Sequence, residues 1–515
     1  MPVKVLIKVS QYYDSVSLML VARELIKLPG VADAAVVMAT EANKGILKQA
    51  GLLTGEAEAA SPNDLVIAVS GASEALDRSL AEAEKLLRKK QAAQEGGAFR
   101  PKTLRGAVKA DPAANMAVIS VAGRYASDEA WDALHSGLHV LLFSDNVSLE
   151  DEIALKQYAV QNGQLLMGPG AGTAILNGVA LGFANLVPRG PVGIVSAAGT
   201  GLQEVSTLLA KAGVGLSQGI GTGGRDLKQE VGALMMLAAL ESLQADPNTQ
   251  VILLVSKPPA EAVARKVLEQ VAKSDKPSVV CLLGGEIAEL ASPNHKIART
   301  LEEAASLAAS FALAGVMPGE SYPAGMGGLT VDPVSLRRHL APGQRYLRGL
   351  FSGGTLCYEA QVIWRDLVSK PVQSNAPLDP SHQLPDSNRS QGHSAVDLGE
   401  EEFTVGRPHP MIDNDLRIRR LIQEAGDPEV AVLMLDVVLG YGAHPDPAGE
   451  LVPAIQRARR LASDGGRGLL VIASVTGTEE DPQRLSAQVQ ALERGGVIVC
   501  PSNAAAARLA AALVV

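Results

Sequence analysis

The chain has 515 residues, enough for about three domains of average size and for several hydrophobic cores. It carries 46 Lys and Arg against 55 Asp and Glu, a formal net charge of -9, and 6 Phe, 8 Tyr and 2 Trp. Because a nucleic-acid groove needs clustered cations and stacking aromatic rings, we expect no nucleic-acid partner. Three cysteines far apart in the sequence predict neither a disulfide framework nor a zinc site.

The amino terminus MPVKVLIKVS has no signal-peptide layout, and no apolar run reaches about 18 residues. The chain is therefore expected to be a soluble, cytoplasmic protein without a membrane partner.

Short apolar runs alternate with segments of helix length, the pattern of βαβ units, so the predicted class is α/β with largely parallel sheets. Four blocks follow in order. Residues 1–98 predict a small α+β N-terminal domain, and residues 103–185, 190–316 and 345–515 predict three further domains. The last is interrupted by residues 371–397, which are polar and aperiodic and are expected to form a mobile insertion with solvated histidines, His382 and His393.

The third and fourth blocks contain an internal repeat. VSAAGTGLQEV (195–205) matches LFSGGTLCYEA (350–360), and GTGGRDL (221–227) has a counterpart in VGRPHPMID (405–413). Each pair joins an apolar strand to a glycine turn and then to a helix. A duplicated nucleotide-fold domain is the simplest explanation.

The paired glycine loops predict anion binding. A glycine turn between a strand and a helix presents unpaired N–H groups at the positive end of the helix dipole, which suits phosphate or carboxylate. Gly199, Thr200 and Gly201 form one such loop, and a second is formed by Gly353, Gly354 and Thr355. A tight turn alone would explain either loop, but their repetition favours an anion in at least one.

Further candidates lie where ligands gather in open α/β sheets, beyond the carboxyl ends of the strands. Lys257 adds a cation to the anion-binding set, and Arg225 and Arg407 occupy matching positions in the repeat. His409, held between two prolines, is a candidate for polarising a carbonyl or donating a proton. No His, Cys or carboxylate cluster has metal-ligand spacing, and Cys357 is interpreted as a small buried residue.

Several segments resemble a known family. GPGAG (168–172), GIVSAAGTGLQEV (193–205) and GIGTGGRDL (219–227) resemble the α-subunit of succinyl-CoA synthetase and related acyl-CoA ligases. Across nearly the whole chain, motifs such as TEANKGIL (40–47) and TVGRPHPMID (404–413) are similar to those of the FdrA family. The resemblance implies a multidomain CoA-ligase-like architecture: a Rossmann-like, CoA-binding-type domain at 103–185 and two flavodoxin-like ligase-type domains at 190–316 and 345–515.

The sequence also departs from the ligases. The loop that carries their phosphohistidine, after the strand matching SVVCLLGGE (278–286), is shortened here, and His295 is not in the expected context. Lys257 stands where the resemblance would place an acidic residue, and no ATP-grasp domain is evident.

One FdrA-type protein is a component of an oxamate carbamoyltransferase, which converts oxalurate and phosphate to oxamate and carbamoyl phosphate. The resemblance therefore implies a subunit of such an enzyme in allantoin nitrogen catabolism, with Arg225, Arg407 and His409 as catalytic candidates. Phosphate would be a substrate, the ligand a small anionic metabolite, no cofactor would be required, and other subunits would complete the enzyme. The alternatives are an acyl-CoA ligase that uses CoA and a non-catalytic subunit that binds CoA or an anion.

Overall fold

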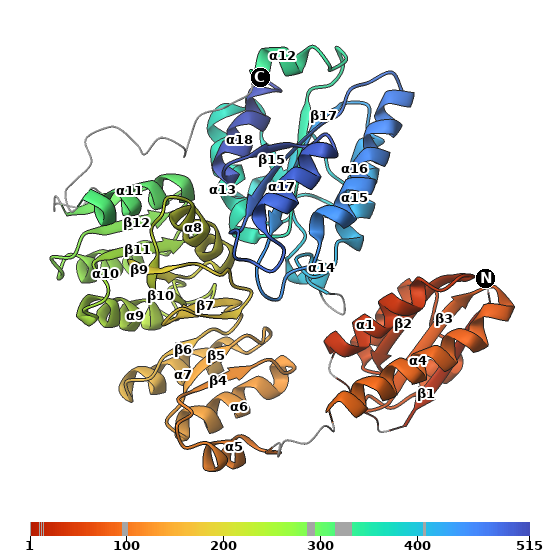
Figure 1. The fold of residues 1–515 in the computed structure, drawn as a ribbon, viewed down its shortest axis with the longest axis horizontal. Coiled ribbons are helices and arrows are strands. Elements are labelled where there is room, and N and C mark those ends of the chain that lie inside the picture. Colours follow the sequence, from red (N-terminus) through yellow and green to blue (C-terminus); the bar gives the residue numbers. More distant parts are fainter. Residues whose placement is uncertain are drawn as a thin grey trace. The chain divides into compact units, whose positions relative to one another are not determined.

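A computed structural model describes residues 2–9, 11, 13, 15–94, 101–285, 294–314, 332–404 and 408–515. The chain divides into two compact units (Figure 1). The first comprises Met1–Pro101 and Glu401–His409, and the second comprises Lys102–Glu400 and Pro410–Val515. Each unit is described by itself.

The first unit is built on a three-stranded antiparallel sheet with the order β1-β3-β2. The central strand β3 is apolar on both faces, so helices cover both: α1 and α4 pack on one face, α2 and α3 on the other. This is the small α+β domain that the sequence predicts. Its elements are β1 (Val3–Lys8), α1 (Ser15–Ile26), β2 (Val31–Met38), α2 (Glu41–Gln49), α3 (Gly55–Ala59), β3 (Leu65–Gly71), α4 (Ser73–Gln94) and the short α14 (Glu401–Thr404).

The second unit begins with a short parallel sheet of order β4-β5-β6. The hairpin of β7 and β8, which lies inside the block predicted at 103–185, pairs instead with β10 of the next sheet. The elements of this region are α5 (Leu104–Ala110), β4 (Met116–Ile119), α6 (Gly123–His135), β5 (His139–Leu142), α7 (Leu149–Gln161), β6 (Leu166–Met167), β7 (Thr173–Leu176) and β8 (Val179–Gly182).

Two larger sheets follow, and they confirm the internal repeat. The first contains the parallel order β13-β12-β11-β9-β10, and the second contains β19-β18-β17-β14-β16. Numbered along each half, both orders read 2-1-3-4-5, which is the flavodoxin-like topology. The sequence therefore predicts the doubled α/β architecture correctly.

The first half contains β9 (Arg189–Ser196), α8 (Gly199–Lys211), β10 (Leu216–Gly221), α9 (Leu234–Ala245), β11 (Val251–Ser256), α10 (Glu261–Val271), β12 (Ser278–Leu282), β13 (His295–Ile297) and α11 (Leu301–Ala314). The second half contains α12 (Pro333–Arg337), β14 (Tyr346–Phe351), α13 (Gly354–Leu367), β15 (Val372–Ser374), the 3-10 helix η1 (Pro380–His382), β16 (His393–Asp397), α15 (Asp415–Ala425), β17 (Val430–Val438), α16 (Pro447–Asp464), β18 (Leu470–Thr476), α17 (Leu485–Arg494), β19 (Ile498–Cys500) and α18 (Asn503–Ala512). One hydrophobic cluster includes buried side chains of α8, α11, α13 and α18, so the two halves share a core.

The prediction of a mobile insertion at 371–397 is wrong for its strands. The strands β15 and β16 extend the second sheet in parallel with β14, and all five residues of β16 are buried. Hydrophobic periodicity misses β16 because several of its buried residues are polar. They can be buried because they have hydrogen-bond partners within the protein: Ser394 Oγ, for example, accepts from the Gln391 amide at 3.1 Å.

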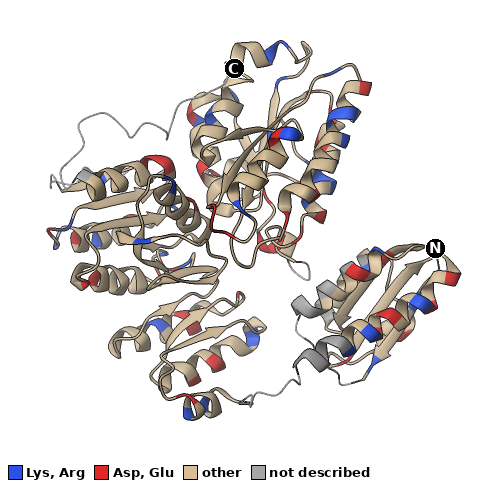
Figure 2. Cartoon of the chain, viewed as in Figure 1, with Lys and Arg blue, Asp and Glu red and all other residues tan. Residues whose placement is uncertain are grey.

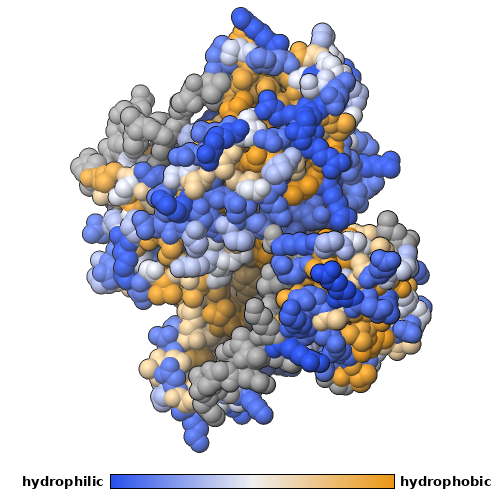
Figure 3. All heavy atoms as spheres, turned by 45° about the vertical axis from the view of Figure 1, so that its right-hand side comes forward, coloured by the Kyte–Doolittle hydropathy of each residue, from blue (hydrophilic) through white to orange (hydrophobic). Residues whose placement is uncertain are grey.

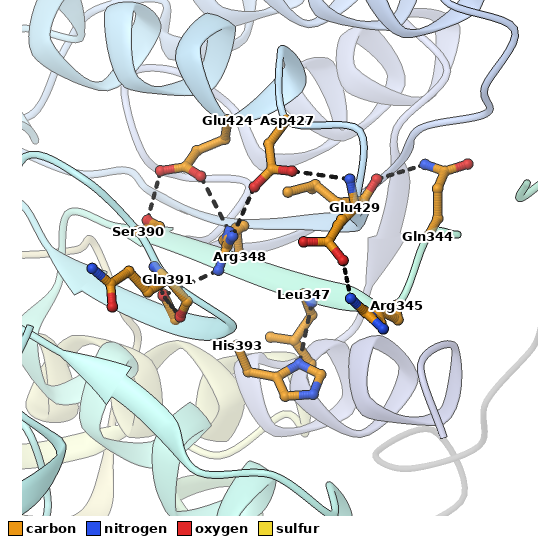
Figure 4. A network of polar contacts seen from close by, with 12 residues as sticks. Gln344, Arg345, Leu347, Arg348, Ser390, Gln391, His393, Glu424, Asp427 and Glu429 are labelled. Atoms are coloured by element: carbon orange, nitrogen blue, oxygen red, sulfur yellow. Dashed lines mark hydrogen bonds and ion pairs between the residues drawn. The ribbon is translucent and has the colours of Figure 1, made fainter. Parts of the chain in front are cut away.

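A polar network surrounds the beginning of β14 (Figure 4). Arg348 is 2% exposed, and its guanidinium lies 3.2 Å from Glu424 and 3.0 Å from Asp427. His393 Nδ1 accepts a hydrogen bond from the Leu347 amide at 3.3 Å. The expectation that His393 is solvated is therefore wrong, since it is 4% exposed and edge-on to the Tyr346 ring.

We expect acid to destabilise the second unit through His393. Burial, helped by the positive charges of Arg348 and Lys370, lowers the pKa of His393 from 6.5 to about 4. Because the unfolded chain then takes up the proton first, the free energy of unfolding should fall by roughly 2–3 kcal/mol between pH 6.5 and 4. Denaturant unfolding across this range should show a smaller fall in His393→Gln, which keeps an acceptor for Leu347. In the exposed control His339→Gln the fall should match that of the wild type, and an unchanged fall in His393→Gln would contradict the assignment.

The surface of the described residues is mixed in character. Figure 2 shows acidic and basic residues interleaved along the helices, and on the face drawn in Figure 3 hydrophobic residues lie among hydrophilic ones. Among the helices that the structure describes, none combines the length and hydrophobicity that a membrane span requires.

Candidate functional site

The topology marks one ligand-binding position in each half. In an order of 2-1-3-4-5, the strand order reverses between the parallel strands 1 and 3, and ligands bind beyond the carboxyl ends of these strands. In the first half the strands are β9 and β11, followed by the Gly199 loop and by Lys257. In the second half they are β14 and β17, followed by the Gly353 loop and by Leu439.

The first loop keeps its amides available. Ala198 is the N-cap residue of α8 and provides no side-chain hydrogen bond, so Gly199, Thr200 and Gly201 occupy the first three helical positions. Among the described residues none accepts a hydrogen bond from these three amides. Gly199 is exposed, so an anion in solvent can reach this end of the helix.

The second loop is already occupied by a carboxylate of the protein. Asp436, fully buried in β17, accepts hydrogen bonds from the amides of Ser352 and Gly353, both at 2.7 Å, and from Ser352 Oγ at 3.0 Å. The Thr355 amide donates to Thr200 Oγ1 at 3.3 Å. In the predicted phosphate cradle at Gly353, Gly354 and Thr355, the Gly353 amide thus binds Asp436 and the Thr355 amide binds Thr200.

The strand register explains this difference. Ser196, the last residue of β9, pairs with Gly221 on one side and Val255 on the other. Its counterpart in the repeat, Phe351, pairs with Asp397, while Asp436 is the next residue after Leu435, the partner of Leu350. Two apolar positions of the first half are therefore carboxylates in the second. Only the first half leaves its loop free for an external anion.

The two loops contact each other. A Cβ atom on Gly353 would lie 2.9 Å from Thr200 Cγ2, and one on Gly201 would lie 3.0 Å from Thr355 Cγ2. The positive ends of α8 and α13 therefore meet head to head, an arrangement that favours negative charge nearby. Asp397 and Asp436 supply part of that charge.

Lys257 approaches the same place from the first half. It follows β11, is half-buried, and its Nζ lies 5.5 Å from the centre of the Tyr358 ring on the first turn of α13. Its positive charge lowers the pKa of the buried Asp397, although burial raises that pKa overall, to about 7. The structure thus brings Lys257 and both predicted loops together.

Arg225 is engaged in a buried ion network. Its Nε lies 2.7 Å from Glu152 Oε2, and its Nη2 donates to the Val147 carbonyl at 2.8 Å. Glu152 also pairs at 2.8 Å with Lys156, which is fully buried and pairs at the same distance with Asp226. These contacts join α7 to the loop after β10, so they give Arg225 a structural role.

The catalytic roles of the other two candidates stay predictions. Arg407 lies outside the described residues. His409 belongs to the first unit and is half-buried there. The shortened loop expected after β12 falls largely on residues 286–293, also outside the described part, while His295 is a buried residue of β13.

Two residues near the loops were not singled out from the sequence. Asp397 ends a strand that hydrophobic periodicity does not reveal. Tyr358 follows the second glycine loop, where anion binding was predicted from Gly353, Gly354 and Thr355 alone. Asp397 could have been found from its equivalence to Gly221, but that equivalence requires the strand pairing.

Metal chemistry has no support in the described residues. No group of three or more His, Cys, Asp or Glu among them could hold an ion. The three cysteines are buried, and burial raises the pKa of the Cys357 and Cys281 thiols well above the ordinary value. The interpretation of Cys357 as a packed residue is confirmed.

Comparison with known families agrees with this architecture. The model described as CoA-ligase matches residues 350–513, and the model described as "AllF, heavy metal-associated domain" matches residues 1–102. The second name implies a metal, but residues 1–102 contain neither Cys nor His, the side chains that bind soft and borderline ions. This segment therefore does not fit a heavy-metal site.

Individual relatives give the same picture. "Uncharacterized protein YahF" of Escherichia coli (strain K12) is 48% identical over 505 residues, which are 98% of this chain and 97% of that protein. The α-subunit of the ADP-forming succinate–CoA ligase of Methanothermobacter thermautotrophicus is 29% identical over 31% of this chain and 55% of that subunit. Thus the chain spans only about half the length of that ligase subunit.

Among solved structures, a dinucleotide-forming acetyl-coenzyme A synthetase of Ca. Korarchaeum cryptofilum is 15% identical, with a TM-score of 0.32 over 78% of this chain and 82% of that one. The CoA-ligase match and the ligase relatives favour the acyl-CoA ligase alternative. None of the proteins named here is a carbamoyltransferase, so the expectation of carbamoyl transfer gains no support from them.

Proposed function

The chain belongs to the same family as protein YahF of Escherichia coli, and within it we propose that this chain catalyses acyl transfer of the CoA-ligase type. An acyl group would pass between phosphate and the thiol of CoA. As the thiol sulfur bonds to the acyl carbon, the bond from that carbon to the phosphate oxygen breaks, and phosphate leaves.

One observation carries this proposal: the free amides of Gly199, Thr200 and Gly201 at an exposed helix N-terminus. They are fixed donors for the charge that develops on the departing phosphate. Lys257 adds a positive charge beyond the neighbouring strand. The loop after β14 has no such free set, because Asp436 binds two of its amides.

CoA in this proposal is a substrate and phosphate is the partner anion. The activation of a free carboxylate by a nucleoside triphosphate would belong to another subunit. This division agrees with the match of the chain to α-subunits of succinate–CoA ligases.

A direct test measures thioester formation by the purified chain. Acetyl phosphate and succinyl phosphate are supplied separately with CoA, and acyl-CoA is quantified together with the binding of inorganic phosphate. Thioester formation and phosphate binding are the expected result. Production of carbamoyl phosphate from oxalurate and phosphate, with no thioester from either acyl phosphate, would overturn the proposal.

The variant Gly199→Asp tests the loop itself. A Cβ at this position meets only Thr173 Oγ1 at 3.5 Å, an ordinary contact, so the fold should tolerate the change. The new carboxylate would sit at the amides as Asp436 does in the second half, and phosphate affinity should fall at least about tenfold. Calorimetric titration with phosphate measures the change.

Gly343→Asp is the matched control. It adds the same charge at an exposed position where a Cβ has no neighbour within 4 Å. Its phosphate affinity should equal that of the wild type. Equal affinity in Gly199→Asp would show that phosphate, if bound, lies elsewhere.

A further inference from the structure

Asp397 is a buried carboxylate with one oxygen left over. It is the last residue of β16 and is 2% exposed. Its Oδ1 accepts a hydrogen bond from the Gly399 amide at 2.9 Å. Among the described residues, no donor makes a hydrogen bond to Oδ2.

The free oxygen faces the junction of the two loops. A Cβ on Gly354 would lie 2.4 Å from Asp397 Oδ2, so only glycine allows this approach. Gly354 is the first residue of α13, and its neighbours Gly353 and Thr355 both contact Thr200 of the first loop. Asp397 Oδ2 therefore lies beside Gly354, and the two residues that flank Gly354 contact the loop proposed to hold phosphate.

The charges around Asp397 come from several elements. Lys257, beyond β11, favours the ionised carboxylate, whereas Glu400 and Asp436 oppose it. The Cys357 thiol on α13 is neutral because its pKa is raised well above the ordinary value by burial. With burial, these charges raise the pKa of Asp397 to about 7, so it exchanges a proton near neutral pH.

We propose that Asp397 is the general acid–base of the acyl transfer, an inference that rests on the function proposed above. As the CoA sulfur bonds to the acyl carbon, the thiol proton moves to Asp397 Oδ2 and phosphate departs with the electron pair of the broken C–O bond. The departing phosphate oxygen then takes this proton from Asp397, which restores the carboxylate for the next turnover. In the reverse direction the protonated Asp397 returns this proton to the thiolate. No oxidant, metal or covalent enzyme intermediate is needed.

Asp397→Asn tests the role, because its amide oxygen still accepts from Gly399 while proton exchange is lost. Thioester formation from acetyl phosphate or succinyl phosphate and CoA should fall about 100-fold or more, with phosphate affinity nearly unchanged. In the wild type, kcat/KM should rise through an apparent pKa near 7. In the variant this limb should move to higher pH, toward the range of an unassisted thiol, about 8.5 or above.

Two measurements do not depend on the folding of Asp397→Asn. Lys257→Met removes the charge that favours ionisation, so the limb of kcat/KM should move to higher pH. Calorimetry of the wild type with sulfate, which does not titrate near neutral pH, should show proton uptake on binding in buffers of different ionisation enthalpy. A bound anion near Asp397 raises its pKa, and this produces the uptake.

The matched control is Asp386→Asn, an exposed Asp whose carboxylate accepts local hydrogen bonds from Asn388 and lies 3.9 Å from Arg389. It should retain the rate and the pH profile. The proton role would be overturned if folded Asp397→Asn kept the wild-type rate and the wild-type pH dependence of kcat/KM. It would also be overturned if Lys257→Met left that pH dependence unchanged. Either result would leave the proposed function standing. Absence of both anion binding and thioester formation would overturn the proposed function and this role with it.

Discussion

Replacing Arg417 by Met should destabilise the second unit by about 3–5 kcal/mol, the cost of leaving one partner of a buried ion pair alone. Arg417 on α15 is 2% exposed, and its Nη1 donates to Asp436 Oδ1 at 2.8 Å and to the Asp436 carbonyl at 2.6 Å. Its Nη2 donates to Asn414 at 2.9 Å. Methionine fills much of the volume but leaves the carboxylate of Asp436 with fewer donors.

Denaturant unfolding of Arg417→Met measures the loss. Arg419→Met is the matched control, because Arg419 lies on the same helix and pairs with Asp415 at a largely exposed site. An exposed pair contributes little, so that variant should lose less than about 1 kcal/mol. Equal losses in the two variants would mean that the buried pair of Arg417 and Asp436 contributes no more to the free energy of unfolding than an exposed pair.

The doubled architecture was predictable because its signals are local. VSAAG and FSGGT each follow an apolar run and precede a helix, and the structure places them at equivalent strand ends. The failure of the prediction at 371–397 is also local in origin. The strand HSAVD in β16 is covered on both faces, so its polar residues are buried and no alternation appears.

The candidate site was only half predictable, because its chemistry depends on strand register. The two glycine loops are alike in sequence, but whether their amides are free depends on the residues that neighbouring strands bring beside them. Gly221 and Val255 lie at one loop, and Asp397 and Asp436 lie at the other. Similarly, the repeat marked Arg225 as a candidate site residue, and only the tertiary structure shows Glu152 beside it.

The two halves have therefore diverged to different tasks within one shared core. The first half keeps a free helix N-terminus, and the second supplies carboxylates to the junction. Neither half contains both the free amides and Asp397. The reaction proposed for this family member accordingly needs both halves held in register.

Glu204→Ala should break that register and cost roughly 2–4 kcal/mol. Glu204 of α8 accepts from the Asn503 amide at the start of α18, at 3.0 Å, and from Thr476 Oγ1 of β18. In the repeat, Glu359 of α13 accepts from the Leu301 amide at the start of α11, at 2.6 Å. Each half thus caps a helix of the other, and alanine would leave two buried donors without an acceptor.

Glu204→Gln is the matched variant, since its amide oxygen still accepts from Asn503 and its amide nitrogen can donate to Thr476 Oγ1. It should lose less than half of the stability that Glu204→Ala loses in denaturant unfolding. Hydrogen exchange of the Asn503 amide should accelerate in Glu204→Ala and stay slow in Glu204→Gln. Wild-type protection of that amide in Glu204→Ala would show that the reciprocal caps do not hold the halves together.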